Sequence, residues 1–218
     1  MLDSSVTVGV LALQGDYEAH RKMLEDRLRA RTAFVRTVGE LEGVDALVLP
    51  GGESTTIIKL MERVGLDTAI RTRIEAGMPV YGTCAGMILL ARDIEGRPNQ
   101  PTLKVMDLTV ARNAFGRQID SFEADVPFLP VTGGVEEGQQ SEAVSSVSSV
   151  SLVRGVFIRA PYITEAGPTV QSLGYFRDCL VAAQQGHLLV TAFHPELTSD
   201  PRVHAYFLNI VQTVHNSK

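Results

Sequence analysis

Tyr81-Gly82-Thr83-Cys84-Ala85-Gly86 places a cysteine between two glycines, one two residues before it and one two residues after it. This spacing is the cysteine counterpart of the G-x-S-x-G pattern, in which a chain turns sharply from a strand into a helix. The flanking apolar residues predict a short strand over Pro79–Tyr81 and a helix over Ala85–Arg92. Because a helix N-terminus stabilises a thiolate, we predict that Cys84 is a nucleophile; the alternative is a small buried cysteine.

Strands and helices alternate on the N-terminal side of this turn, and strands dominate on its C-terminal side. This alternation predicts a three-layer α/β fold of the flavodoxin-like kind, with a mostly parallel sheet flanked by helices. Helices are predicted over Tyr17–Arg29 with Asp16 as N-cap, Thr55–Val64 with Ser54 as N-cap, Leu66–Ala76, and Arg202–Val214 after Asp200-Pro201. Further strands are predicted over Val6–Leu13, Ala33–Val38, Ala46–Leu49, Leu108–Ala111, Val153–Ile158, Val170–Leu173, Leu180–Gln184 and Leu188–Phe193.

The composition favours one soluble domain over residues 1–218, with 44% apolar residues and a formal net charge of −5. The mild acidity and the lack of a Lys/Arg cluster argue against nucleic acid as a partner. The first apolar run, Val6–Leu13, is too short to cross a membrane and has no basic leader, so we expect no membrane partner and a cytoplasmic location. The positions of the His, Cys and Asp residues predict no metal site, and no cofactor is expected.

The chain has two cysteines, Cys84 and Cys179. They could form a disulfide, but in a reducing compartment two free thiols are the expected state. Cys179 lacks flanking glycines and is predicted to be structural.

Phe193-His194-Pro195-Glu196 closes the apolar run at Leu188–Phe193. Side chains two apart on an extended backbone point to the same side, so His194 and Glu196 are predicted to interact. A histidine held by a carboxylate is the base that a thiol nucleophile needs; the alternative is a polar residue at a strand end. The remaining histidines have no such neighbour and are interpreted as surface or packing residues: His20, His187, His204 and His215.

A third segment, Leu49-Pro50-Gly51-Gly52-Glu53-Ser54, joins a predicted strand to a predicted helix. It is either an ordinary turn or a loop whose backbone N–H groups face a developing oxyanion. In the second case Gly52 supplies one donor and Ala85, which follows the nucleophile, supplies the other. A phosphate-binding loop is a rival, but neither glycine motif of such loops is present.

Three features remain open from the residues alone. Arg112 and Arg159 each end an apolar strand, and each either forms a surface ion pair or holds a substrate carboxylate. The Ser/Val-rich segment at 129–152 is either an edge strand or a flexible loop inserted in the domain, and its composition favours the loop.

The elbow at Cys84 and the His194-Pro195-Glu196 segment together resemble the class I, triad-type glutamine amidotransferases. Further motifs cover nearly the whole chain and resemble one branch of that family, the glutaminase subunits of pyridoxal 5′-phosphate synthases. These motifs are Leu11-Ala12-Leu13-Gln14-Gly15, Leu49-Pro50-Gly51-Gly52-Glu53-Ser54-Thr55-Thr56, Arg112-Asn113-Ala114-Phe115-Gly116-Arg117-Gln118, Asp120-Ser121-Phe122-Glu123, Gly155-Val156-Phe157-Ile158-Arg159-Ala160-Pro161 and Phe193-His194-Pro195-Glu196-Leu197-Thr198.

The resemblance implies a class I glutamine amidotransferase-like fold and hydrolysis of L-glutamine to L-glutamate and ammonia. It implies that ammonia passes to a separate synthase subunit, in a hetero-oligomer, for the synthesis of pyridoxal 5′-phosphate (vitamin B6). By matching position it implies a triad of Cys84, His194 and Glu196. It also implies contacts to glutamine from Gly52, Glu53, Ser54, Arg112, Ile158 and Arg159. The segment at 129–152 departs from the family in being longer and richer in Ser and Val.

Two other functions are compatible with parts of this pattern. One is a different cysteine-elbow hydrolase, DJ-1-like or a γ-glutamyl hydrolase, and the other is a catalytically silent regulatory subunit. The His-Pro-Glu pairing, the Pro-Gly-Gly-Glu-Ser loop and the Arg-Asn-x-Phe-Gly-Arg segment favour the amidotransferase. The intact set of Cys84, His194 and Glu196 argues against a silent subunit.

Overall fold

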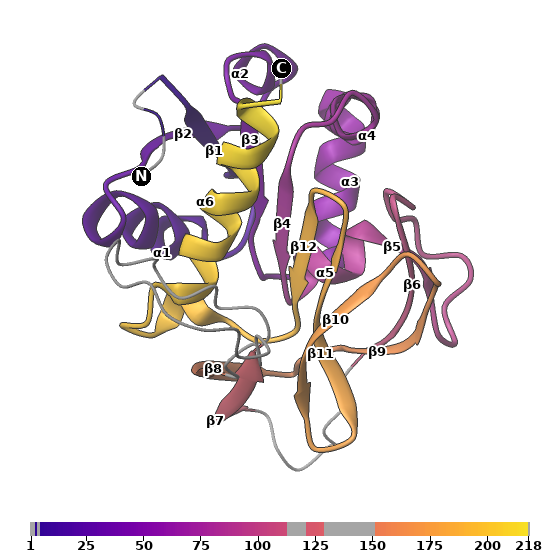
Figure 1. Ribbon diagram of the computed structural model, residues 1–218. Coiled ribbons are helices and arrows are strands. Elements are labelled where there is room, and N and C mark those ends of the chain that lie inside the picture. Colours follow the sequence, from indigo (N-terminus) through magenta and orange to yellow (C-terminus); the bar gives the residue numbers. More distant parts are fainter. Residues whose placement is uncertain (1–2, 4, 113–120, 129–150, 218) are drawn as a thin grey trace, which may run out of the picture.

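A parallel sheet forms the centre of the molecule, with the strand that leads to Cys84 near its middle (Figure 1). The computed structural model describes residue 3 and residues 5–112, 121–128 and 151–217. The strands run in the order β2-β1-β3-β4-β12, and each neighbouring pair is parallel. This is the order of flavodoxin-like folds, so the predicted fold class is confirmed. The bounds are β1 (Thr7–Leu11), β2 (Arg31–Val35), β3 (Ala46–Leu49), β4 (Val80–Thr83) and β12 (Leu188–Thr191).

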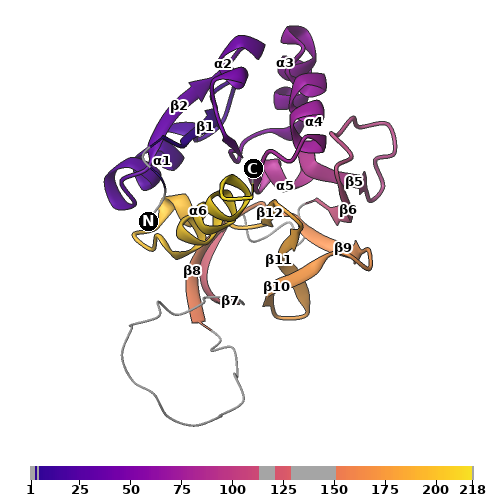
Figure 2. The same ribbon diagram turned by 45° about the horizontal axis from the view of Figure 1, so that its top comes forward.

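Helices cover both faces of this parallel sheet, and therefore its central strands are buried (Figures 1 and 2). On one face lie α1 (Tyr17–Lys22), the π-helical turn at Met23–Arg27, and α6 (Arg202–His215). On the other lie α3 (Ser54–Val64), α4 (Leu66–Glu75) and α5 (Ala85–Leu90), while the short α2 (Val38–Glu42) packs beside β2 and α4. Side chains alternate along β4: Tyr81 packs on Phe207 of α6, with ring centroids 5.6 Å apart, whereas Gly82 lies against α5.

The sheet continues beyond β12 as an antiparallel region. The order β12-β11-β10-β7-β8 joins β11 (Cys179–Gln185), β10 (Gln171–Phe176), β7 (Ser121–Phe128) and β8 (Ser151–Ile158). A side branch contains β5 (Ala91–Ile94), β6 (Met106–Ala111) and β9 (Tyr162–Ala166). This region contributes to the site because β8 returns to the parallel sheet, where the amide of His194 donates to the carbonyl of Val156 at 2.8 Å.

Several helix ends differ from the sequence prediction. Ser54 is not the N-cap of α3; Glu53 is, because its carboxylate accepts the amides of Thr55 and Thr56. The helix after the elbow ends at Leu90 rather than Arg92, and residues 91–94 form β5 instead. The predicted cap Asp16 is confirmed, since its carboxylate accepts the amide of Ala19 at 3.3 Å.

Some elements were not predicted, among them α2, β7 and β9. A sequence signal existed for α2, because Thr37 and Glu40 form a capping box that fixes its first turn. The predicted strand at Ala33–Val38 is wrong at its end for the same reason, since Val38 already belongs to α2. Of the Ser/Val-rich segment at 129–152, positions 129–150 lie outside the described residues, as do positions 113–120 of the family motifs, and positions 151–152 belong to β8.

The elbow depends on a close approach between α5 and β3. A Cβ added at Gly86 would overlap the carbonyl oxygen of Leu49, a backbone atom at the end of β3. Neither the helix nor the central strand can move without disturbing the buried core around it. Glycine at position 86 is therefore required by packing.

Gly86→Ala is expected to lower the free energy of unfolding by roughly 1–3 kcal/mol, the usual cost of forcing extra atoms into a packed interior. Gly39→Ala is the matched control, because a Cβ there meets nothing within 4 Å and Gly39 lies in α2. The control is expected to be neutral or stabilising by up to about 1 kcal/mol. Urea unfolding of both variants tests this, and equal stability of the two would contradict the packing argument.

Candidate active site

Cys84 occupies a strained turn between β4 and α5. Its backbone has φ 47° and ψ −99°, a conformation that residues with a side chain rarely adopt. The amide of Cys84 donates to the carbonyl of Thr191 at 2.8 Å, which ties the turn to the neighbouring strand β12. The predicted elbow is therefore present, and it places the thiol at the carboxyl ends of the parallel strands.

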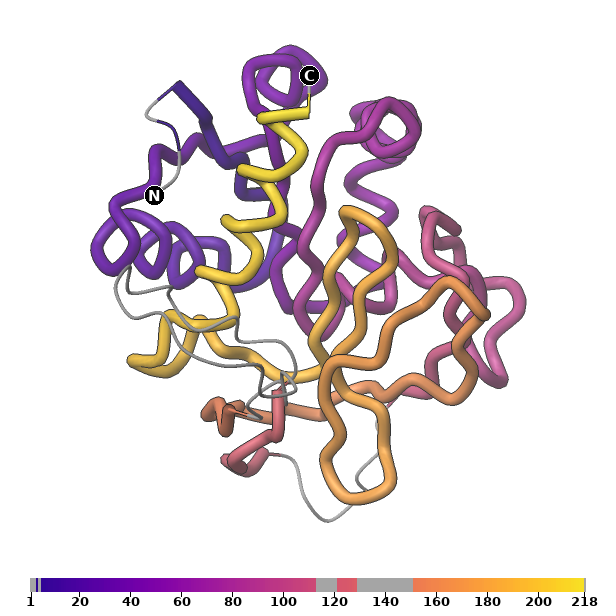
Figure 3. Tube along the Cα trace, viewed as in Figure 1, coloured from indigo at the N-terminus to yellow at the C-terminus, as the bar shows by residue number. Residues whose placement is uncertain are grey.

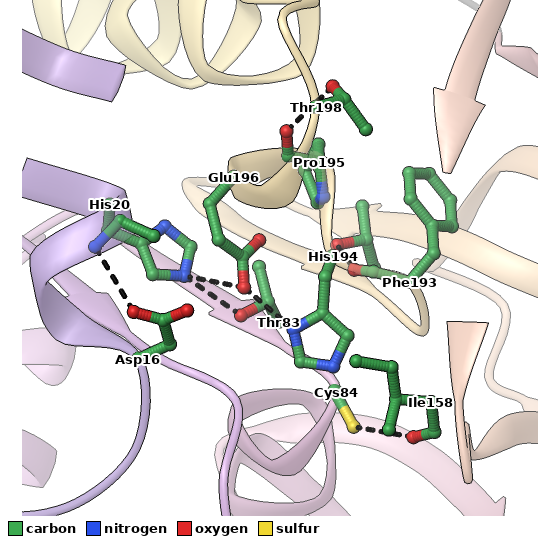
Figure 4. Close-up of polar contacts among 12 residues, drawn as sticks. Asp16, His20, Thr83, Cys84, Ile158, Phe193, His194, Pro195, Glu196 and Thr198 are labelled. Carbon is green, nitrogen blue, oxygen red and sulfur yellow. Dashed lines mark hydrogen bonds and ion pairs between the residues drawn. The ribbon is translucent and has the colours of Figure 1, made fainter. Parts of the chain in front are cut away.

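His194 and Glu196 meet directly, but for a different reason from the one predicted. Their backbone is not an extended strand, because β12 ends at Thr191 and Pro195–Leu197 forms a 3-10 turn. The turn brings His194 Nδ1 to 2.7 Å from Glu196 Oε1. Since Nδ1–H donates to the carboxylate, the other ring nitrogen is directed towards Cys84, as Figure 4 shows.

The three side chains are buried and electrically coupled. Burial lowers the pKa of His194, but its hydrogen bonds to Cys84 and Glu196 outweigh burial and raise that pKa to about 10. Burial raises the pKa of Glu196, but His20 and His194 outweigh it and hold that pKa below its usual range. Because the pKa of His194 is raised from 6.5, its proton stabilises the fold fully below pH 6.5, and this contribution is lost as the pH rises through about 10.

A cavity of ≈ 380 Å³ opens in front of Cys84 and His194. All six residues expected to contact a ligand line it: Gly52, Glu53, Ser54, Arg112, Ile158 and Arg159. The carbonyl of Ile158 lies 3.9 Å from the Cys84 sulfur. Glu196 does not line the cavity, because it lies behind the His194 ring (Figure 4).

Two residues outside the predicted site hold the glycine loop in place. The amide of Asp16 donates to the carbonyl of Gly51 at 3.3 Å, and the amide of Glu53 donates to Gln14 Oε1 at 2.8 Å. Because a trans peptide directs its C=O and N–H to opposite sides, the contact at Gly51 also fixes the direction of the Gly52 N–H. A Cβ at Gly51 would overlap the His194 ring, so the loop contacts the proposed base directly. Only the motif at Leu11–Gly15 pointed to this region in the sequence.

The two arginines differ in their surroundings. Arg112 pairs with Glu53 at 2.8 Å and donates to Gln100 Oε1 at 2.9 Å, and Gln100 in turn donates to the Ser54 hydroxyl at 3.0 Å. Arg159 follows β8 with φ 43° and makes no ion pair with any residue of the described ranges. Arg112 is thus part of an ion pair that forms a wall of the cavity, and Arg159 lines the same cavity with its charge unpaired among the described residues.

The second cysteine, Cys179, and the histidines other than His194 do not line this cavity. Cys84 and Cys179 are both free thiols, as predicted, and burial raises the pKa of Cys179. His187 contacts a backbone carbonyl, that of Ile74. His20 and His204, which were interpreted as surface or packing residues, are fully buried and hydrogen-bonded to each other.

The described residues contain neither a metal-binding cluster nor a membrane-spanning helix. No group of three or more His, Cys, Asp and Glu side chains there is arranged to hold a metal ion. No helix in the same ranges has the length and apolar character needed to cross a bilayer.

Comparison with known proteins identifies the family. A model of the SNO glutamine amidotransferase family matches residues 10–213. The chain belongs to this family. The family and the fold inferred from the elbow and the His-Pro-Glu segment are therefore confirmed.

Similar members of the SNO glutamine amidotransferase family match along almost their whole length. The pyridoxal 5′-phosphate synthase subunit PdxT of Kineococcus radiotolerans is 49% identical over 218 residues, which cover 97% of this chain and 98% of that protein. The subunit of the same name from Acidothermus cellulolyticus is 50% identical over 210 residues, with 94% and 93% covered. A crystal structure of a glutamine amidotransferase has a TM-score of 0.81 at 44% identity, covering 94% of this chain and 98% of that one.

Glu196→Gln is expected to lower the pKa of His194 well below 10, because the amide removes the negative charge that stabilises the imidazolium. The NMR titration of ¹⁵N-labelled histidine in this SNO amidotransferase measures the change directly. Glu18→Gln is the control, since Glu18 pairs with Arg21 on the exposed side of α1. An unchanged His194 midpoint in Glu196→Gln would show that the carboxylate does not set the charge of the ring.

Proposed function

We propose that this chain hydrolyses L-glutamine through a triad of Cys84, His194 and Glu196 and delivers the ammonia to the synthase subunit of a pyridoxal 5′-phosphate synthase. One observation carries the proposal: a carboxylate oxygen lies 2.7 Å from Nδ1 of His194, and the other ring nitrogen of His194 faces a cysteine on a nucleophile elbow (Figure 4). Family membership gives the reaction class, and the names of the similar PdxT proteins support the partner.

The first half of the reaction forms a thioester. The thiolate of Cys84 attacks the side-chain amide carbon of glutamine, while the raised pKa keeps His194 protonated beside it. Backbone N–H groups of Gly52 and Ala85 are proposed to bind the oxyanion, Ala85 being the first residue of α5. His194 then gives its proton to the leaving nitrogen, the carbon–nitrogen bond breaks, and ammonia is released.

The second half regenerates the enzyme. Neutral His194 takes a proton from water, and the hydroxide adds to the thioester carbon. The carbon–sulfur bond breaks, glutamate leaves, and the thiolate is again paired with protonated His194. Glu196 keeps its charge in both halves and stabilises the imidazolium whenever it forms.

The cavity wall has the charges that an amino acid needs. The guanidinium groups of Arg159, which has no ion pair among the described residues, and of Arg112 are proposed to bind the α-carboxylate of glutamine. Glu53, whose pKa is lowered because the Thr55 and Arg112 contacts outweigh burial, remains ionised near the ammonium group. Gly52, Ser54 and Ile158 complete the proposed contacts.

A route for control by the partner lies in the loops around the cavity. The Gly51-Gly52 peptide carries the proposed oxyanion donor, and it is held by Asp16 and Gln14, which follow β1. Glycine allows this peptide to rotate at little steric cost. Docking of the synthase on the loop at Gln14-Gly15-Asp16 is therefore proposed to select the orientation that directs the N–H towards the oxyanion.

Cys84→Ser is expected to abolish glutamine hydrolysis while the fold remains intact, because an alcohol at this position forms no stable anion near neutral pH. Cys179→Ser is the matched control and is expected to retain most activity, since Cys179 lies outside the cavity. Glutamate release and circular dichroism are measured for both. Equal loss in the two variants would place the nucleophile elsewhere.

Titration of the isolated chain with the synthase subunit is expected to raise glutaminase activity at least tenfold and to saturate near one partner per chain. One oxyanion donor contributes roughly 10²–10³ in rate, so its correct orientation accounts for a rise of this size. The Cys84→Ser chain with the same synthase controls for activity of the partner itself. Full activity of the isolated chain, unchanged by the synthase, would refute control by docking.

A further inference from the structure

A chain of buried polar side chains lies behind Glu196, on the side away from the cavity. His20 of α1 places Nε2 at 3.3 Å from Glu196 Oε1 and at 3.1 Å from the Thr83 hydroxyl (Figure 4). Its other nitrogen, Nδ1, lies 3.0 Å from Nε2 of His204 in α6. His20, Thr83 and His204 are completely buried, so solvent does not supply these hydrogen bonds.

The contacts determine where the protons lie. A nitrogen that faces a carboxylate oxygen carries a hydrogen, so His20 donates from Nε2. His204 has no partner for Nδ1 among the described residues, and a buried N–H without an acceptor is costlier than a bare lone pair. His204 therefore carries its hydrogen on Nε2 and donates it to Nδ1 of a neutral His20. Burial is the main cause that lowers the pKa of His204 to about 3, which keeps His204 neutral.

Glu196 depends on this chain for its hydrogen bonds. Its Oε2 atom is buried and has no partner among the described residues. Its Oε1 atom accepts the hydrogen bond of His194 at 2.7 Å and lies 3.3 Å from Nε2 of His20, whose single N–H is shared with the Thr83 hydroxyl at 3.1 Å. A buried carboxylate with a single donor is poorly compensated and is free to turn about its terminal bond. The donor from His20 opposes that rotation.

We infer that His20 is a positioning residue for the reaction: its Nε2–H holds Glu196 in the orientation that serves His194, and His204 fixes the tautomer that makes His20 a donor. This inference rests on the proposed function, in which Glu196 orients the base. His20 touches neither the cavity nor the reacting atoms. Its proposed role passes through Glu196, and its contact with the Thr83 hydroxyl fixes the position of its ring. The alternative is a histidine that only fills space between α1 and β4.

Two conservative variants separate these roles. Glutamine at position 20 places an amide N–H where Nε2 lies, whereas asparagine reaches only as far as Nδ1 and leaves Glu196 without the second donor. His20→Asn is expected to lower kcat by roughly tenfold or more, as expected for losing a hydrogen bond to a charged group, with KM for glutamine changed by less than about threefold. His20→Gln is expected to recover most of that loss. His187→Asn, which alters a histidine bonded to a backbone carbonyl outside the cavity, serves as the control.

Equal kcat values in His20→Gln and His20→Asn, whether both normal or both low, would overturn the inference, because a donor at the Nε2 position would then make no difference. A second measurement needs no variant. In ¹⁵N-histidine NMR spectra of the wild-type chain at neutral pH, His20 and His204 are both expected as neutral Nε2–H tautomers. An Nδ1–H tautomer or a doubly protonated ring at His20 would also overturn it.

These results are distinguishable from failure of the proposed function. Cys84→Ser assayed in parallel reports on the nucleophile, whereas the tautomers of His20 and His204 are measured without substrate. Retained hydrolysis in Cys84→Ser would refute the triad, and the histidine spectra would still establish or exclude the Nε2–H tautomer of His20 that the inference requires.

Discussion

The parallel pairing of β4 with β12 is the interaction on which the rest of the site depends. It sets Thr83 opposite Thr191, so the chain leaves these two neighbouring strands at the same level, towards Cys84 from one and towards His194 from the other. The path of the whole chain is traced in Figure 3. The amide of Cys84 also donates to the carbonyl of Thr191, and therefore the strained elbow is held by the same strand that leads to the histidine. A shift of one residue in this register would separate the thiol from the base and direct the strand side chains to the wrong layers.

Glu196 keeps its negative charge although its carboxylate is buried beside these two strands. Removing a carboxylate from water costs several kcal/mol, and contacts of Glu196 Oε1 with two histidines offset part of that cost. His194, which precedes the 3-10 turn, donates to Oε1 at 2.7 Å, and Nε2 of His20, in the helix that Asp16 caps, lies 3.3 Å from the same oxygen. Both faces of the sheet therefore contribute: α5 supports the nucleophile, and α1 with α6 supports the carboxylate.

The cavity wall is connected to the surface through few contacts. Glu53 caps α3, pairs with Arg112, and is fixed through its amide by Gln14. The neighbouring carbonyl of Gly51 is held by Asp16, and the ring of His194 lies directly against Gly51. A displacement of the loop after β1 would thus reach the glycine loop and the base together, which is the structural basis for the proposal that a partner docked at this loop controls the site.

The sequence alone determined the class of fold and the chemistry of its central residues. Glycines around Cys84 and the alternation of strands and helices are local features, and local sterics and periodicity decide them. It also indicated most residues that line the cavity, because they belong to short motifs at strand ends. The prediction missed the antiparallel strands β7 and β9, whose pairing joins distant segments. Side chains alternate weakly along β9, whereas β7 does alternate between more and less exposed residues, a local signal that the prediction did not use. Only the tertiary structure decided that Glu53 rather than Ser54 caps α3, and that Gln14 supports the glycine loop. It alone revealed that His20 and His204, isolated in the sequence, meet behind Glu196. The hydrogen bond between His20 and His204, which are 184 positions apart, depends on how helices pack on the sheet, and no local pattern encodes that geometry.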